Sequence, residues 1–125
     1  MYGTPVEFKN LEGKTLSGVK IVRNNISEYD RIDFICDNGD VYRMTHIQEC
    51  CEDVTIEDIV GDLNDLIGDQ ILVANEITQI TDDEISVTWT FYTLATIKGT
   101  VTIRWFGASN GYYSETVDLF KIEKK

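Results

Sequence analysis

The densest group of side chains with chemical potential lies in the stretch RWFGASNGYYSETVD, residues 104–118. Asn110 and Gly111 suit a tight turn, because both residue types tolerate positive φ at low steric cost. A turn does not need an arginine and several aromatic rings around it. Flat rings and a guanidinium suit a planar anionic ligand such as a nucleotide, although Trp and Tyr beside a turn also occur as simple sheet packing. The candidate ligand-binding residues here are Arg104, Asn110, Tyr112, Tyr113 and Ser114.

A second group is the run His46-Ile47-Gln48-Glu49-Cys50-Cys51-Glu52. Imidazole and thiolate are zinc ligands, but a closed tetrahedral site takes four ligands in paired spacings. This run has the single histidine of the chain and two adjacent cysteines. We therefore expect no metal, and we add His46 to the candidate ligand-binding residues as a hydrogen-bond donor at a strand end.

The same run allows a thiol enzyme, in which His46 acts as base and Cys50 or Cys51 as nucleophile. No third group that would orient the histidine is evident, and free cysteines often behave as small core residues. The chain also lacks a glycine-rich dinucleotide fingerprint, a phosphate-binding loop and a nucleophile elbow. We expect a protein that is not an enzyme and needs no cofactor, with the thiol enzyme as a minor alternative.

Length and composition favour one packed domain over residues 1–125, with an N-terminal lead at 1–12 and a basic tail at 123–125. Hydrophobic residues make up 42% of the chain and proline occurs once. We recognise neither a membrane span nor a signal peptide, so the expected location is the cytoplasm. The adjacent Cys50 and Cys51 suit a reducing compartment, and we do not expect them to form a structural disulfide.

The chain is strongly acidic, with 22 Asp and Glu against 11 Lys and Arg and a formal net charge of -11. Such a field repels nucleic acid and anionic membranes, so we expect neither as a partner. Screening limits distant charges to about 8 to 10 Å, so a local basic pocket can still hold a small anion.

Period-two alternation predicts strands over residues 15–22, 31–36, 41–45, 71–78, 85–95, 100–106 and 115–122. The sequence Asp37-Asn38-Gly39-Asp40 predicts a hairpin between the second and third of these. In the long strand, Val87, Trp89 and Phe91 share one face. Thr88, Thr90, Tyr92 and Leu94 share the other, where Thr90 or Tyr92 can line a cleft.

Between residues 54 and 67 the apolar spacing changes to three and four, which predicts helix. Gly61 is expected to divide this segment into two short helices, with Asp62 capping the second and Gly68 ending it in a left-handed turn. Residues 79–84 read as a polar connection. The fold class expected is α+β, a single mostly antiparallel curved sheet with one or two short helices packed on it.

Two motifs, HIQECCE at residues 46–52 and RWFGASNGYYSE at residues 104–115, together with WTFY at 89–92, give the chain a resemblance to a family of small phage and prophage proteins. We identify that group with the Thoeris anti-defence proteins, which act as sponges for a cyclic ADP-ribose isomer. The resemblance implies a phage protein in the infected bacterial cell that binds and sequesters a nucleotide immune signal, a cyclic ADP-ribose isomer or a cyclic oligonucleotide, without cleaving it. It also implies a homo-oligomer.

The main alternative is an acidic inhibitor whose surface imitates the phosphate field of DNA and occupies a basic groove on a host or defence protein. The net charge of -11 favours this interpretation. The two hypotheses differ in what would abolish binding, because a sponge depends on Arg104 and Tyr112 whereas a mimic depends on the carboxylates of residues 53–69.

Overall fold

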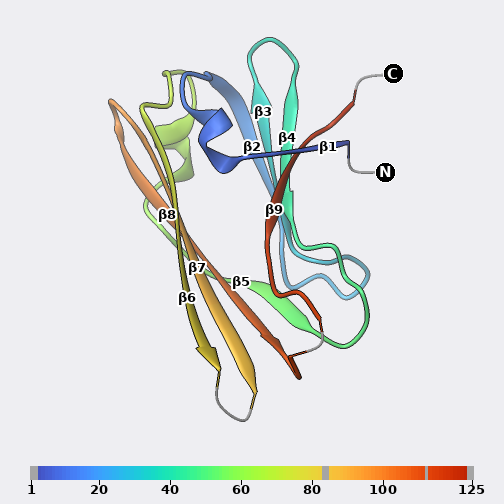
Figure 1. The fold of residues 1–125 in the computed structure, drawn as a ribbon. Helices are drawn as coiled ribbons and strands as arrows, with labels where there is room; N and C mark the ends of the chain where they lie inside the picture. Colours follow the sequence, from blue (N-terminus) through green and yellow to red (C-terminus); the bar gives the residue numbers. More distant parts are fainter. Residues whose placement is uncertain (1–2, 83–84, 112, 124–125) are drawn as a thin grey trace.

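The computed structural model describes residues 3–82, 85–111 and 113–123 and forms two antiparallel sheets that pack face to face (Figure 1). The five-stranded sheet has the order β1-β9-β4-β3-β2 and the four-stranded sheet the order β5-β8-β7-β6. The strands of the first sheet are β1 (Thr4–Val6), β2 (Leu16–Val22), β3 (Arg31–Cys36), β4 (Val41–Thr45) and β9 (Asp118–Lys121). Those of the second are β5 (Asp53–Val60), β6 (Val73–Asp82), β7 (Ser86–Thr96) and β8 (Gly99–Ser109).

Two short 3-10 helices, η1 (Phe8–Leu11) and η2 (Leu63–Leu66), pack on the sheets through Phe8, Leu11 and Leu66, which are buried. A mostly antiparallel architecture with short helices is thus confirmed. The strands divide into two sheets rather than forming one curved sheet. The reason is that each group of paired strands buries one face of alternating apolar side chains, and each buried face needs an apolar partner.

The core lies between the sheets. The inward positions of β8 are Val101, Ile103 and Trp105, all 1% exposed or less. They face the largely buried side chains Ile32, Phe34, Met44 and Leu119 of the five-stranded sheet. The Trp105 ring donates its Nε1–H to Met44 Sδ at 3.2 Å, so the packing joins the two sheets. Alternation along β7 is as predicted, with Thr88, Thr90, Tyr92 and Leu94 buried.

The predicted helix over residues 54–60 is wrong, because this segment is strand β5. Val54, Thr55, Ile56, Ile59 and Val60 are β-branched and suit a pleated surface. A bulge at Glu57 shifts the register against β8, so that Ile56 and Ile59 both lie on the core side although they are three residues apart. The bulge therefore gives the buried apolar residues of a strand the three-residue spacing that is typical of a helix.

The second short helix is confirmed as η2, where Asp62 accepts a hydrogen bond from the Asn64 N–H at 2.9 Å. Gly68 has φ 91, the left-handed conformation predicted after this helix.

Three other boundaries differ from the prediction. The polar segment after residue 78 continues β6 as far as Asp82. Polar residues are suited to this part of the edge strand, because no second layer covers it. The N-terminal lead contains β1 and η1. The last strand begins only at Asp118. The segment before it contains the buried Glu115, which bonds to the four-stranded sheet instead of continuing the strand.

Candidate functional site

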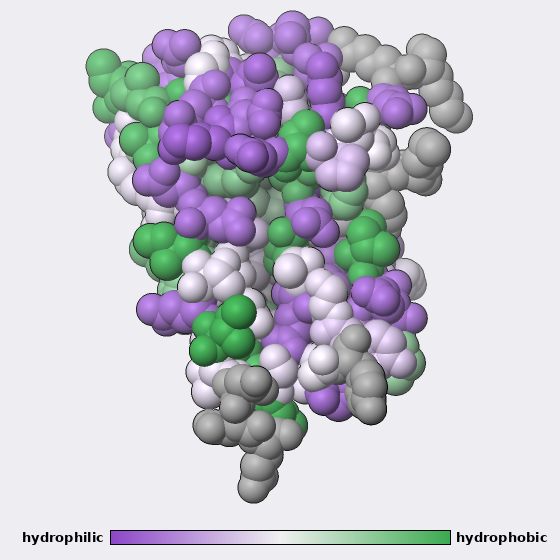
Figure 2. Space-filling view, viewed as in Figure 1, coloured by the Kyte–Doolittle hydropathy of each residue, from purple (hydrophilic) through white to green (hydrophobic). Residues whose placement is uncertain are grey.

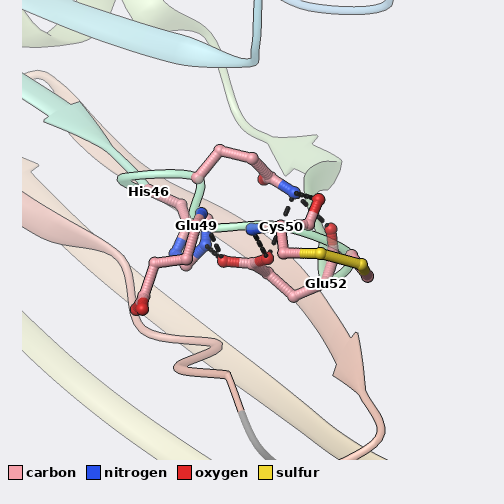
Figure 3. Close-up of a disulfide and its surroundings, with 6 residues drawn as sticks. His46, Glu49, Cys50 and Glu52 are labelled. Atoms are coloured by element: carbon pink, nitrogen blue, oxygen red, sulfur yellow. Dashed lines mark hydrogen bonds and ion pairs between the residues drawn. A yellow bond between two sulfur atoms is a disulfide. The ribbon is translucent and has the colours of Figure 1, made fainter.

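The loop at residues 46–52 is organised around the Glu52 carboxylate (Figure 3). Its Oε2 accepts a hydrogen bond from the Glu49 N–H and its Oε1 one from the Cys50 N–H, both at 2.9 Å. Gln48 Nε2 donates to the Glu52 carbonyl oxygen at 2.6 Å. Burial raises the pKa of Glu52, but the N–H groups of Cys50 and Glu49 and the His46 ring lower it more, to about 2. The carboxylate is therefore a structural anion that holds the loop in shape.

His46 completes this arrangement instead of facing solvent. It is 5% exposed, with Nε2 2.8 Å from Glu52 Oε2 and Nδ1 2.6 Å from the Thr116 carbonyl oxygen. Both partners are acceptors, so both ring nitrogens can donate when the ring is the imidazolium. The stretches at residues 46–52 and 104–118 meet here, because His46 links the 46–52 loop to the segment before β9. A direct ligand contact by this buried ring is not supported.

Cys50 and Cys51 are joined by a disulfide in the same loop. This corrects the expectation of two separate thiols. The expectation treated the backbone as extended, which would turn adjacent side chains apart. Glu52 instead gathers the N–H groups before it, so the chain bends at Cys50 and Cys51 and their side chains converge on the surface.

A second buried carboxylate, Glu115, anchors the segment that follows the Asn110-Gly111 turn. Thr88 Oγ1 donates to Glu115 Oε1 at 2.8 Å, and the Ser109 hydroxyl donates to Oε2. The segment passes so close to β8 that a Cβ at Gly107 would lie 2.9 Å from the Glu115 Cβ. Glycine at this position is required for the close approach.

The candidate residues of the turn region are dispersed. Asn110 is exposed at the end of β8, and Tyr112 lies outside the described residues. Tyr113 is half-buried, and its carbonyl oxygen lies 3.2 Å from Ser109 Oγ. The hydroxyl of Ser114 is exposed and lies 2.7 Å from Thr116 Oγ1.

Arg104 lies on the opposite, outward face of β8. Its guanidinium carbon lies 5.6 Å from the centroid of the Trp89 ring, and that ring contacts Phe106 edge-on at 5.0 Å. Nη2 pairs with Glu57, and Asp58 lies 3.9 Å away. The hydrogen bond to Glu57 raises the pKa of Arg104, so the group stays charged. We name Arg104, Trp89 and Phe106 the outer aromatic site.

Trp105, the ring next to Arg104 in sequence, points into the core and is 1% exposed. The ring that contacts Arg104 comes from the neighbouring strand, where Trp89 pairs with Phe106. Alternation in the sequence places Arg104 and Phe106 on one face, but only the register between β7 and β8 brings Trp89 beside them.

An open cleft of about 520 Å³ separates the two sheets at one side of the molecule. Its walls include Met44 and Leu119 from the five-stranded sheet and Ala74 and Tyr92 from the four-stranded sheet, so the predicted cleft position of Tyr92 is confirmed. Figure 2 shows hydrophilic residues gathered over the upper part of this side, with hydrophobic residues between them.

The charges around this cleft are mostly negative, from Glu7, Glu76 and Asp118. Partial desolvation and, as a smaller cause, the charge of Asp118 raise the pKa of Glu76. The nearby Lys9 already contacts Glu12 at 3.2 Å and Asn75 at 3.3 Å. The negative charge of these carboxylates disfavours a phosphate ligand in the cleft. Of the two surfaces, the outer aromatic site has the chemistry for a planar anion.

The fold and these surfaces describe a small two-sheet β protein with structural polar networks and a partly exposed arginine-aromatic group. A family model matches residues 9–119, and the chain belongs to that family, a domain of unknown function (DUF7448). No curated protein and no solved structure matches the chain. In the described part of the chain, neither helix has the length and apolar character needed to cross a bilayer.

Proposed function

We propose that this protein binds and sequesters a small nucleotide immune signal, a cyclic ADP-ribose isomer or a cyclic oligonucleotide, as a phage anti-defence protein that leaves the signal intact. The observation that carries the proposal is the outer aromatic site, in which the Arg104 guanidinium lies over the Trp89 ring next to Phe106. A base can stack on such rings while the guanidinium pairs with a phosphate.

The ion pair between Arg104 and Glu57 does not block this role. Both side chains are 39% exposed, and exposed ion pairs contribute little free energy because water screens them. Glu57 also sits on a bulge at the edge of the sheet. A phosphate can therefore replace Glu57 as the partner of Arg104 at small cost.

Sequestration also agrees with the state of the residues that a thiol enzyme would need. The ring nitrogens of His46 face the Glu52 carboxylate and the Thr116 carbonyl, and the two cysteines are bonded to each other. This arrangement presents neither a free base nor a thiolate beside it.

The test is to incubate the purified protein with cyclic ADP-ribose isomers and cyclic oligonucleotides, denature it by heat, and identify the released compounds by mass spectrometry. We expect one compound to be recovered intact. Titration calorimetry with that compound should show a loss of affinity of about tenfold to a hundredfold in Arg104→Ala, the scale of a lost charge-assisted hydrogen bond.

The matched control is Arg31→Ala, which removes another ion-paired arginine, bonded to Glu28 at 2.9 Å on the five-stranded sheet. It should bind as the wild-type protein does. Recovery of a converted compound would indicate an enzyme, and retention of no compound would contradict sequestration.

A second candidate function, an acidic inhibitor of a host or defence protein, is favoured by the carboxylates along the β5 edge and the turn after it. Asp53, Glu57 and Asp62 are exposed there. Complex formation with a basic partner would weaken steeply with added salt and with the triple change of these residues to Asn or Gln. Unaltered binding in that triple variant would contradict this function.

A further inference from the structure

The edge strands of the two sheets differ in how they are protected against pairing with another strand. Native edges are usually blunted by proline, lysine, a bulge or short length. Strand β1 has three residues and contains Pro5. Strand β2 has a register irregularity between Leu16 and Gly18 and carries Lys20. Strand β5 has the bulge at Glu57.

Strand β6 has none of these features. Its ten residues, Val73–Asp82, pair with β7 in one uninterrupted register from Val73 to Asp82. Its sequence contains no proline, lysine or arginine. Of the side chains described on it, only Glu76 carries a charge, whereas Ile77 is 61% and Ile80 is 69% exposed. A long, regular edge without proline or basic residues, and with two exposed isoleucines, is a template for strand addition.

The hydrogen bonds show which backbone groups this edge presents. The Ala74 N–H points away from β7 and donates to Glu12 Oε2 at 3.0 Å. Hydrogen-bonding direction alternates along an antiparallel strand, so the N–H and C=O groups of Glu76, Thr78 and Ile80 point the same way. Glu12 covers the start of the edge, and the stretch from Glu76 to Ile80 remains open beside it.

We propose that this stretch of β6 pairs antiparallel with β6 of a second copy of the chain, joining the two four-stranded sheets into one continuous sheet. A two-fold axis at Thr78 places Glu76 opposite Ile80 of the second copy, so the two Glu76 carboxylates do not face each other. Within the four-stranded sheet, the other edge strand, β5, carries three acidic residues and β6 carries two, so two copies of this sheet repel each other less at β6 than at β5.

The shape of the molecule is compatible with this approach. The far ends of β6 and β7 extend beyond the five-stranded sheet, so a second hairpin can lie alongside them (Figure 1). The pairing uses backbone groups of β6 and leaves Arg104 uncovered, because Arg104 lies on β8, two strands away in the sheet. The proposal therefore stands or fails independently of nucleotide binding.

The experiment is sedimentation equilibrium over a range of protein concentrations, with two variants that act on the edge. Thr78→Pro removes an N–H that points away from β7, so the pairing of β6 with β7 is retained. Ile80→Lys adds the charge that edge strands commonly carry. The matched control is Ile97→Lys, which makes the same change at an 81% exposed position in the turn between β7 and β8.

We expect the wild-type protein and Ile97→Lys to reach twice the chain mass of 14.2 kDa, and both edge variants to remain at the single-chain mass with an unchanged circular dichroism spectrum. Hydrogen exchange should be slow at the Glu76, Thr78 and Ile80 amides in the wild-type protein and fast in Ile80→Lys.

A wild-type protein of single-chain mass at every concentration would overturn the proposal. A folded Ile80→Lys that still dimerises with the same amides protected would also overturn it. If Thr78→Pro fails to fold, Ile80→Lys and the exchange measurement decide the question alone.

Discussion

The His46–Glu52 pair and the Arg104–Glu57 pair each join a basic side chain to a carboxylate, but in opposite environments. His46 and Glu52 are 5% and 4% exposed and share their remaining hydrogen bonds with backbone groups. The Arg104 and Glu57 side chains are each 39% exposed and form their pair on an outward sheet face. A buried pair cannot lose one partner without leaving a desolvated charge, whereas an exposed pair can exchange its partner with solvent or ligand. The first pair is therefore suited to hold structure and the second to bind.

The largest effect expected from this comparison is on stability in His46→Ala. Removing the ring leaves the buried Glu52 carboxylate and the Thr116 carbonyl without their hydrogen-bonding partner. The free energy of unfolding should fall by about 3–5 kcal/mol, measured by urea denaturation. Glu57→Ala, which breaks the exposed pair, is the control and should leave the urea midpoint nearly unchanged. Equal losses in the two variants would remove the distinction between the pairs.

A smaller effect is expected at the second buried carboxylate. Thr88→Val keeps the shape of the side chain but removes the donor to Glu115 Oε1, which should cost about 1–3 kcal/mol in the free energy of unfolding. Thr90→Val is the matched control, because Thr90 lies on the same face of β7 and is similarly buried. A loss in Thr90→Val as large as that in Thr88→Val would mean that the bond to Glu115 is not the cause.

The pH dependence of stability can sharpen the assignment of Glu52. Its folded pKa of about 2 lies below the ordinary value of 4.5, so ionised Glu52 stabilises the fold fully above about pH 4.5. This contribution is lost as pH falls from 4.5 toward 2. The advantage in urea midpoint of the wild-type protein over Glu52→Gln should therefore shrink over this window. An advantage independent of pH would show that the loop does not depend on the charge.

The smallest stability effect, but a gain in binding, is expected for Glu57→Gln. The variant removes the carboxylate that competes with a phosphate for Arg104, while the fold keeps its other contacts. Affinity for the retained nucleotide should rise, as measured by titration calorimetry, with an unchanged urea midpoint. Lower affinity in this variant would indicate that Glu57 itself contacts the ligand.

Local pattern predicted most strands, because alternation along β3, β4, β7 and β8 is a direct consequence of burying one face of a sheet. It failed at β5, where the bulge at Glu57 changes the spacing of Ile56 and Ile59 to one that helices also show. A bulge is a property of a strand together with its partner, so no reading of β5 alone could identify it.

The same limit applied to the candidate site. Residue types placed Arg104 and His46 among the same candidate ligand contacts, but the fold places one on an outward sheet face and buries the other. Glu52 and Glu115 looked like two acidic residues among many, and their roles depend on N–H and hydroxyl donors supplied by other segments.

The sequence by itself determined the mostly antiparallel architecture, the hairpin at Asn38-Gly39, the cap and left-handed end of η2, and the two inward-facing patterns of β7 and β8. These follow from local sterics and from side-chain alternation, which neighbouring residues fully specify. Only the tertiary structure decided that Trp89 lies beside Arg104, that Cys50 and Cys51 are bonded, and that β6 is the unprotected edge. Each depends on strand order, register or burial, which arise when distant segments pair.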